Sequence, residues 1–272
     1  MAYNLLKGKK GIIFGALDDK SIAWKTAIKA YEEGAQLILT NAPIALRMGT
    51  IQDLSKKVGE APVIGADATS IEDIENLYIA ARDHFGGGVD FILHSIGMSP
   101  NVRKGRSYGD LNYEWFQKTL DVSGLSFHKV MQAAEKMDIM NDWGSIIALS
   151  YIAAQRTFPD YSDMAQAKAL LESIARSYGY RMAKKKKVRV NTISQSPTVT
   201  TAGTGIGGFD VFMDFAEKMS PLGNATAEDC ANYCVMMFSD LTRKVTMQNL
   251  MHDGGFSSSG ITEDLVKRLT GK

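Results

Sequence analysis

Short apolar runs and amphipathic stretches alternate along the whole chain. The apolar runs are rich in Val, Ile and Leu and end at glycine or polar residues, which is typical of buried strands. They fall at 11–15, 35–40, 61–65, 89–94, 145–149, 188–193 and 245–252. The intervening stretches repeat apolar residues at helical spacing, at 22–33, 46–57, 71–85, 115–137, 165–183 and 227–238. The pattern therefore predicts strands that are separated by helices.

This alternation predicts the fold class. Strands that alternate with helices pair in parallel, because each connection must cross back over a face of the sheet. We therefore expect an α/β fold, a Rossmann-like, doubly wound parallel sheet of about seven strands with helices on both faces. The 272 residues contain no Pro/Gly/Ser-rich linker and no shift in composition, so we expect a single domain over 1–272.

The first strand, helix and strand suit a nucleotide phosphate. Gly15 ends the first apolar run, and Ser21 can cap a helix that begins at Ile22 and ends at Gly34. Since a helix N-terminus can hold a pyrophosphate, we predict that Gly15, Ser21 and Ile22 bind a cofactor. The segment lacks a full G-x-G-x-x-G pattern, and a purely structural turn explains it nearly as well.

Two tyrosines and a lysine form the most informative group in the sequence. Tyr151 follows the strand at 145–149, and Tyr161 and Lys168 come ten and seventeen residues later. On a helix, residues seven apart lie roughly 20° out of line, so Tyr161 and Lys168 would share one face. A phenol and an ammonium beside a strand end suit proton delivery and the binding of sugar hydroxyls. Taken alone, the pair is explained equally well by solvated side chains on an exposed helix.

Composition excludes several functional classes. With 31 basic and 30 acidic residues the formal net charge is +1, so no global field favours nucleic acid or an anionic membrane. We interpret the basic run at 184–187, with Arg189, as the solvated end of a helix. No segment approaches the ~20 apolar residues of a membrane span, and the first residues do not form a signal peptide.

Cysteine usage points to a reducing compartment. Cys230 and Cys234 lie four apart on one predicted helix, in a stripe with other apolar residues. This placement favours buried reduced thiols over a disulfide or a metal site. We therefore expect a cytoplasmic protein without a metal centre.

Six short motifs stand out between about Leu5 and Phe256. They are Gly15-x5-Ser21-Ile22-Ala23, His94-Ser95-Ile96-Gly97, Leu149-Ser150-Tyr151, Pro159-x-Tyr161-x6-Lys168-Ala169, Arg189-Val190-Asn191 and Asp253-Gly254-Gly255-Phe256. In this order and at these spacings the chain resembles the enoyl-acyl-carrier-protein reductases of bacterial fatty-acid synthesis. That family belongs to the short-chain dehydrogenase/reductase superfamily.

The resemblance implies a reaction and roles for the central group. In it, NADH delivers a hydride to the β-carbon of a trans-2-enoyl thioester held on acyl carrier protein, and charge develops on the thioester oxygen. The resemblance implies that Tyr161 donates to this oxygen, that Lys168 binds the nicotinamide ribose and that Tyr151 lines the substrate side. A donor aimed at the developing charge is usually the largest catalytic term. Ser99 is expected to be a further substrate contact, and the family implies a homotetramer.

The alternative function is the reduction of a ketone or a β-ketoacyl thioester. Carbonyl-reducing members of the superfamily carry a Tyr-x-x-x-Lys pair about a dozen residues after an active-site Ser. Here Asp163 stands at that distance from Ser150. A literal Tyr180-x-x-x-Lys184 does occur, but at the far end of the predicted helix beside the lysine run, so we do not expect it to be catalytic.

The resemblance also suggests how the cofactor is held. It places contacts at Asp67 and Ala68 for the adenine, at Ser95, Ile96 and Gly97 for the adenosine ribose and nicotinamide, and at Thr198 and Thr200 for the nicotinamide amide and phosphates. The residues after the second strand, Thr40 to Pro43, offer no cation to a 2′-phosphate, which favours NADH over NADPH. Arg47 lies a few residues further on and leaves NADPH as the alternative.

The segment from about Thr198 to Met219 is predicted to be a substrate lid. Its glycine-rich part lacks the preceding strand and the lysine of a phosphate loop. Its apolar face would be formed by Phe209, Val211, Phe212, Met213 and Phe215, which would serve equally well as ordinary core. Just before it, Ser196 stands where the family commonly has glycine, so the backbone there is expected to differ.

Overall fold

The computed structural model describes residues 2–47, 50–158, 161–200 and 209–271. Seven parallel strands form one sheet in the order β3-β2-β1-β4-β5-β6-β7. They are β1 (Lys10–Phe14), β2 (Gln36–Asn41), β3 (Val63–Gly65), β4 (Val89–His94), β5 (Met140–Ser150), β6 (Arg189–Gln195) and β7 (Asn249–His252). The predicted α/β fold class is confirmed.

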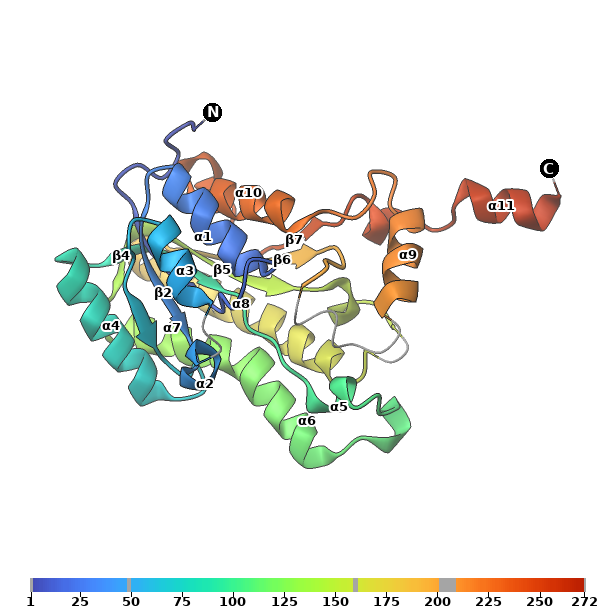
Figure 1. The fold of residues 1–272 in the computed structure, drawn as a ribbon, viewed down its shortest axis with the longest axis horizontal. Helices are drawn as coiled ribbons and strands as arrows, with labels where there is room; N and C mark the ends of the chain where they lie inside the picture. Colours follow the sequence, from blue (N-terminus) through green and yellow to red (C-terminus); the bar gives the residue numbers. More distant parts are fainter. Residues whose placement is uncertain (1, 48–49, 159–160, 201–208, 272) are drawn as a thin grey trace.

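Helices cover both faces of this sheet (Figure 1). In chain order the helices are α1 (Ile22–Glu32), α2 (Pro43–Leu46), α3 (Ile51–Lys57), α4 (Ile71–Phe85), α5 (Pro100–Arg103), α6 (Tyr113–Leu120), α7 (Ser126–Lys136), α8 (Met164–Lys186), α9 (Phe209–Met219), α10 (Ala227–Phe238) and α11 (Glu263–Thr270). A π-helical turn, η2 (Asp121–Leu125), joins α6 to α7.

Two apolar cores lie on opposite faces of the sheet. Successive side chains of a strand point to opposite faces, so Ile12 and Phe14 of β1 pack in one core and Ile13 packs in the other. The first core includes residues of α4, α7 and α8, and the second includes residues of α1, α3 and α10. This arrangement explains why the strands are nearly continuous apolar runs, because both of their faces are buried.

The strand order reverses direction at β1 and β4. The chain moves outward from β1 to β2 and β3, then returns to place β4 on the other side of β1. At this point Gly15 has φ +94°, and a Cβ built on it would lie 2.0 Å from the carbonyl oxygen of Ser95. Ligands of doubly wound sheets bind in the crevice at such a switch point, beyond the carboxyl ends of the strands.

Several predicted boundaries were wrong. The helix expected at 46–57 is divided into α2, which has Pro43 in its first turn, and α3. The strand expected at 245–252 begins only at Asn249, because Met247 before it has a left-handed backbone, φ 62°. The helix α11 was not predicted; it extends away from the sheet and exposes apolar residues such as Leu269 (Figure 1).

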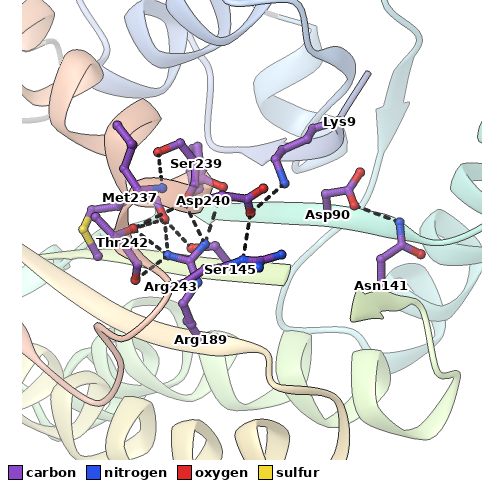
Figure 2. A network of polar contacts seen from close by, with 12 residues as sticks. Lys9, Asp90, Asn141, Ser145, Arg189, Met237, Ser239, Asp240, Thr242 and Arg243 are labelled. Carbon is purple, nitrogen blue, oxygen red and sulfur yellow. Dashed lines mark hydrogen bonds and ion pairs between the residues drawn. The ribbon is translucent and has the colours of Figure 1, made fainter. Parts of the chain in front are cut away.

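Arg189 was expected to be solvated with the neighbouring lysines, and that prediction was wrong. The side chain is only 2 % exposed. Its guanidinium donates to the carbonyl oxygens of Met237 at 2.9 Å in the last turn of α10, and of Ser239 at 3.2 Å and Thr242 at 3.0 Å just beyond it (Figure 2). A cation is favourable there because the last carbonyls of a helix lack partners and carry partial negative charge.

Two further predictions concern thiols and membrane spans. Cys230 and Cys234 are both buried and free, as predicted. Among the described residues, no helix is long and apolar enough to cross a membrane.

Candidate active site

A cavity of about 1170 Å³ lies beyond the carboxyl ends of the strands. Its wall is formed by residues at the ends of several strands and in the turns that follow, including Gly15, Asn41, Ser95, Ser150 and Ser196. Ligand pockets usually measure roughly 300–1,000 Å³, so this cavity is large enough for a dinucleotide and part of a second molecule.

The cavity brings together most of the residues that were predicted to form the site. Those that line it are Gly15, Ser21, Ile22, Asp67, Ser95, Ile96, Gly97, Tyr151, Tyr161, Lys168, Thr198 and Thr200. Ala68 lines a smaller cavity of about 70 Å³, which also touches Asp67. Ser99 lines neither; it is buried and its hydroxyl donates to Asp163 at 2.6 Å.

The turn between β1 and α1 forms one end of the cavity. Ser21 is the N-cap of α1, and its hydroxyl accepts from the Trp24 amide at 3.3 Å and donates to the Asp18 carbonyl at 2.8 Å. These bonds hold the turn so that the N-terminus of α1 faces the cavity. Backbone N–H groups and the helix dipole make such a terminus a binding site for an anion.

The segment after β2 forms the neighbouring wall. The Asn41 side chain donates to the Ala16 carbonyl at 2.9 Å and accepts from the Ala42 amide at 2.9 Å, so it fastens this segment to the first turn. Asn41, Ala42 and Ile44 line the cavity. Arg47 ends α2, is exposed and is not part of the cavity wall.

The two tyrosines lie next to each other in the cavity wall. Their ring centroids are 5.1 Å apart, and Tyr151 follows β5 directly. Tyr161 does not lie on the helix, as we had expected; it precedes α8 and is separated from it by Ser162, which has φ 48°, and by Asp163. The shared-face argument was therefore wrong, although both Tyr161 and Lys168 line the cavity.

Burial keeps both phenols neutral. Desolvation raises the pKa of Tyr161 above its ordinary value. Burial also raises the pKa of Tyr151, and the neighbouring Tyr161 and Asp253 raise it further. A neutral phenol is a hydrogen-bond donor, so both side chains can donate to a ligand oxygen.

Lys168 is buried on α8 with its ammonium held by main-chain oxygens. Its Nζ donates to the carbonyls of Leu149 at 2.8 Å and Ile96 at 3.2 Å. Burial lowers the pKa of Lys168 to about 8, against the opposing effect of Glu172. Burial and the charge of Lys168 lower the pKa of His94 to about 3, so this strand-end histidine is neutral and pairs with the Ser126 hydroxyl at 2.9 Å.

The two halves of the cavity have different walls. The half beside β1 is formed largely by turns at the strand ends, whose positions depend on the sheet. The other half is formed by aromatic side chains: Phe158 and Phe212 contact the Tyr151 ring with centroids 5.6 Å and 5.8 Å away. Phe212, Val211 and Phe215 come from α9, which is part of the predicted lid. Residues 201–208 of that lid lie outside the described part of the chain.

Sequence reasoning missed Gln195 at the end of β6. It lines the cavity, its Oε1 accepts from His252 Nδ1 at 2.7 Å, and its Nε2 donates to Thr198 Oγ1 at 3.2 Å. Ser196 next to it fits without a left-handed backbone, and its hydroxyl accepts from the Ala225 amide at 3.1 Å. Its shortest hydrogen bond joins it to His252, 57 residues away, and no local pattern could have indicated that pair.

The literal Tyr-x-x-x-Lys pair lies away from the cavity. Tyr180 is 59 % exposed, and the Lys184 ammonium sits over its ring, 5.8 Å from the centroid. Neither residue lines the cavity. Asp163, at the place where carbonyl-reducing relatives carry their tyrosine, is fully buried and does not line it either.

Comparison with known proteins identifies the family. The family model described as "Enoyl-(Acyl carrier protein) reductase" matches residues 15–257. The chain belongs to the enoyl-acyl-carrier-protein reductase family. It is 32 % identical over 261 residues to "Enoyl-[acyl-carrier-protein] reductase [NADH] 1" of Rhizobium meliloti, covering 96 % of this chain and 94 % of the relative. It is 36 % identical over 262 residues to the NADH enoyl reductase FabI of Rickettsia bellii, covering 96 % and 98 %.

Solved structures of this reductase family have the same fold. The FabI–NADH complex from Alistipes finegoldii superposes with a TM-score of 0.94 at 65 % identity, covering 96 % of this chain and 92 % of that one. The NADH enoyl reductase of Aquifex aeolicus superposes with a TM-score of 0.87 at 33 % identity, covering 94 % and 99 %.

Within the described residues, no cluster of three or more His, Cys, Asp or Glu side chains could hold a metal ion.

Proposed function

We propose that the protein reduces trans-2-enoyl thioesters with NADH, on acyl-carrier-protein-bound substrates of fatty-acid elongation. The observation that carries this proposal is one cavity in which an anion-binding helix N-terminus, a buried lysine and two neutral phenols meet. The named functions of the relatives, and the NADH in the Alistipes finegoldii complex, support the same assignment.

The cavity wall fits a dinucleotide. The N-terminus of α1 is available for a pyrophosphate, Asp67 for the adenosine end, and the Lys168 ammonium for ribose hydroxyls. When bound, NADH supplies the hydride that adds to the β-carbon of the enoyl group. No basic residue follows β2 in the cavity wall before α2, which supports NADH over NADPH.

The residues of the chain then act on the thioester oxygen. Negative charge develops on that oxygen as the C=C bond accepts the hydride, and the Tyr161 hydroxyl is proposed to donate to it. Tyr151, in ring contact with Tyr161, lines the same side. The α-carbon then takes a proton from solvent, so that one hydride and one proton saturate the double bond. The apolar wall from Phe158 to α9 receives the acyl chain.

A turnover assay tests the proposal. NADH oxidation is followed with a trans-2-enoyl thioester and, separately, with a β-ketoacyl thioester of the same chain length. We expect oxidation with the enoyl substrate alone. Oxidation only with the β-ketoacyl thioester would assign the chain to the carbonyl reducers instead, which the exposed Tyr180 and Lys184 do not favour.

Assembly and location are further parts of the proposal. We expect a homotetramer in the cytoplasm, as the family resemblance implies. Sedimentation velocity at micromolar concentration measures the assembly, and a monomeric species under assay conditions would contradict this expectation.

A further inference from the structure

A buried carboxylate lies two residues after Tyr161. Asp163 is 0 % exposed, and it accepts three hydrogen bonds: from Ser99 Oγ at 2.6 Å, Asn101 Nδ2 at 2.7 Å and Thr119 Oγ1 at 2.9 Å. Within the described part of the chain, no basic side chain forms an ion pair with it. Burying a carboxylate is costly, and here three neutral donors and the N-terminus of α8 offset that cost.

The three donors belong to segments that are distant in sequence. Ser99 is the N-cap of α5, where its hydroxyl also accepts from the Val102 amide at 3.0 Å. Asn101, within α5, exchanges two bonds with the backbone of Asn112, the N-cap of α6, at 3.1 and 3.0 Å. Thr119 lies on α6 itself. The carboxylate therefore joins α5 and α6 to the start of α8.

In these segments, residues that directly precede Ser99 and Thr119 line the cavity. Gly97 and Met98 precede Ser99 and line the cavity, and Lys118, which also lines it, precedes Thr119. The carboxylate itself does not line the cavity, so it touches no ligand there. Its effect on the site must pass through the segments that it holds.

On the other side, the carboxylate fixes the approach to α8. Ser162 has a left-handed backbone, φ 48°, which is uncommon for a residue with a side chain and persists only when its surroundings hold it. It lies directly between Tyr161 and Asp163, and Asp163 O accepts from the Ala167 amide at 3.1 Å in the first turn of α8. With Asp163 anchored by three bonds, the strained residue sets the direction in which Tyr161 enters the cavity.

We propose that Asp163 is the positioning residue of the enoyl reductase site: it fixes Tyr161 and the cavity wall at Gly97 and Met98 relative to each other. This inference rests on the proposed function, because its effect is on the donation by Tyr161 to the thioester oxygen. It also gives a physical role to the position at which the carbonyl-reducing relatives carry their tyrosine.

The first experiment compares Asp163→Ala with Asp163→Asn in steady-state kinetics. A misplacement of about 1 Å can cost on the order of 100-fold in rate, so we expect kcat of Asp163→Ala to fall roughly 10- to 100-fold. The NADH dissociation constant, measured by fluorescence, should rise by less than kcat falls, because most of the cofactor half rests on the sheet, while Gly97 among the expected cofactor contacts lies in the wall that Asp163 holds. Asp163→Asn keeps the shape and one acceptor oxygen, so it should restore most of the lost rate.

Two threonines provide a milder, matched pair. Thr119 and Thr26 are both fully buried helix residues whose hydroxyls donate to the carbonyl four residues earlier, each at 2.8 Å. Only the Thr119 hydroxyl also lies within hydrogen-bond distance of Asp163 Oδ2, at 2.9 Å, so its single proton is shared between the two acceptors. We expect Thr119→Val to lower kcat several-fold and Thr26→Val to leave it unchanged, with similar losses in melting temperature. This pair decides the matter if Asp163→Ala fails to fold.

Asp90 offers a control for the loss of a bonded aspartate. It accepts from the Lys10 amide at 2.8 Å and from Asn141 Nδ2 at 3.0 Å, near the amino ends of β1 and β4 (Figure 2). Asp90→Ala should lower the melting temperature without changing kcat.

A folded Asp163→Ala with wild-type kcat, or equal kcat for the two threonine variants, would overturn the positioning role. Failure of the wild-type enzyme with enoyl thioesters would instead overturn the proposed function.

Discussion

The Tyr161 hydroxyl is the donor that the proposed mechanism depends on most. Burial raises its pKa, so it keeps its proton at neutral pH. Removing one donor at a developing oxyanion usually costs on the order of 10²–10³ in rate, and we expect that loss in kcat for Tyr161→Phe. The affinity for NADH should persist, since the phenol is not proposed to bind the cofactor. Unchanged turnover at saturating NADH would remove Tyr161 from the mechanism.

Lys168 gives the site a dependence on pH. Its folded pKa of about 8 lies below the ordinary value of 10.5, so between these two pH values the unfolded chain binds a proton that the folded enzyme has lost. In this window the stability of the ligand-free enzyme rises with pH through this group. NADH affinity should change in the opposite direction, because the ammonium that meets the ribose is lost above about pH 8. Titrations of Lys168→Gln should lack this dependence, and Lys184→Ala should behave like the wild-type enzyme.

At the scale of elements, the segment from β2 into α2 sets the choice of cofactor. Asn41 and Ala42 line the cavity, Arg47 does not, and no cation is available there for a 2′-phosphate. A missing charge-assisted bond is worth roughly 1.5–3 kcal/mol, so NADH should exceed NADPH by about tenfold or more in kcat/KM. Kinetics with both cofactors at a fixed enoyl substrate measure this ratio. Equal efficiencies, or an NADPH preference that Arg47→Ala abolishes, would contradict it.

Across the whole molecule, stability and chemistry are anchored at opposite ends of the sheet. Arg189 binds several carbonyls at the end of α10 and just after it, near the amino end of β6 and away from the cavity. Arg189→Met removes several hydrogen bonds from a buried charged donor, each worth about 1.5–3 kcal/mol, although Met237 O keeps Ser145 Oγ as a donor and Thr242 O keeps the Val245 amide. We therefore expect a melting temperature lower by on the order of 5–10 °C. Activity well below the transition should be unchanged. A loss of kcat in the folded variant would show that the two ends are coupled.

The sequence predicted those features that depend on local chemistry. Gly15 and Ser21 follow from the needs of a tight turn and a helix cap, and the strands follow from runs buried on both faces. Asp163 and Gln195 could not be found in this way. The partners of Asp163 lie 44 to 64 residues away and His252, a partner of Gln195, lies 57 residues away, and such polar pairs produce no periodic pattern in the sequence. Arg189 was misjudged for the same reason: it follows a lysine run, but its partners lie near α10, about 50 residues later.

The two halves of the cavity wall differ in how well they tolerate mutation, and this difference affects how resistance to an inhibitor can arise. Gly15 and Ser95 leave no room for a substituent between β1 and β4, so a mutation there disturbs the sheet and carries its own penalty. On α9, Val211 is 76 % exposed and Phe215 is 48 % exposed, and substitutions at such sites seldom harm folding. Resistance to compounds held by the aromatic wall can therefore arise by single changes that keep the enzyme folded. For compounds that contact mainly the backbone of the strand-end turns, far fewer substitutions can weaken binding and still leave the enzyme folded.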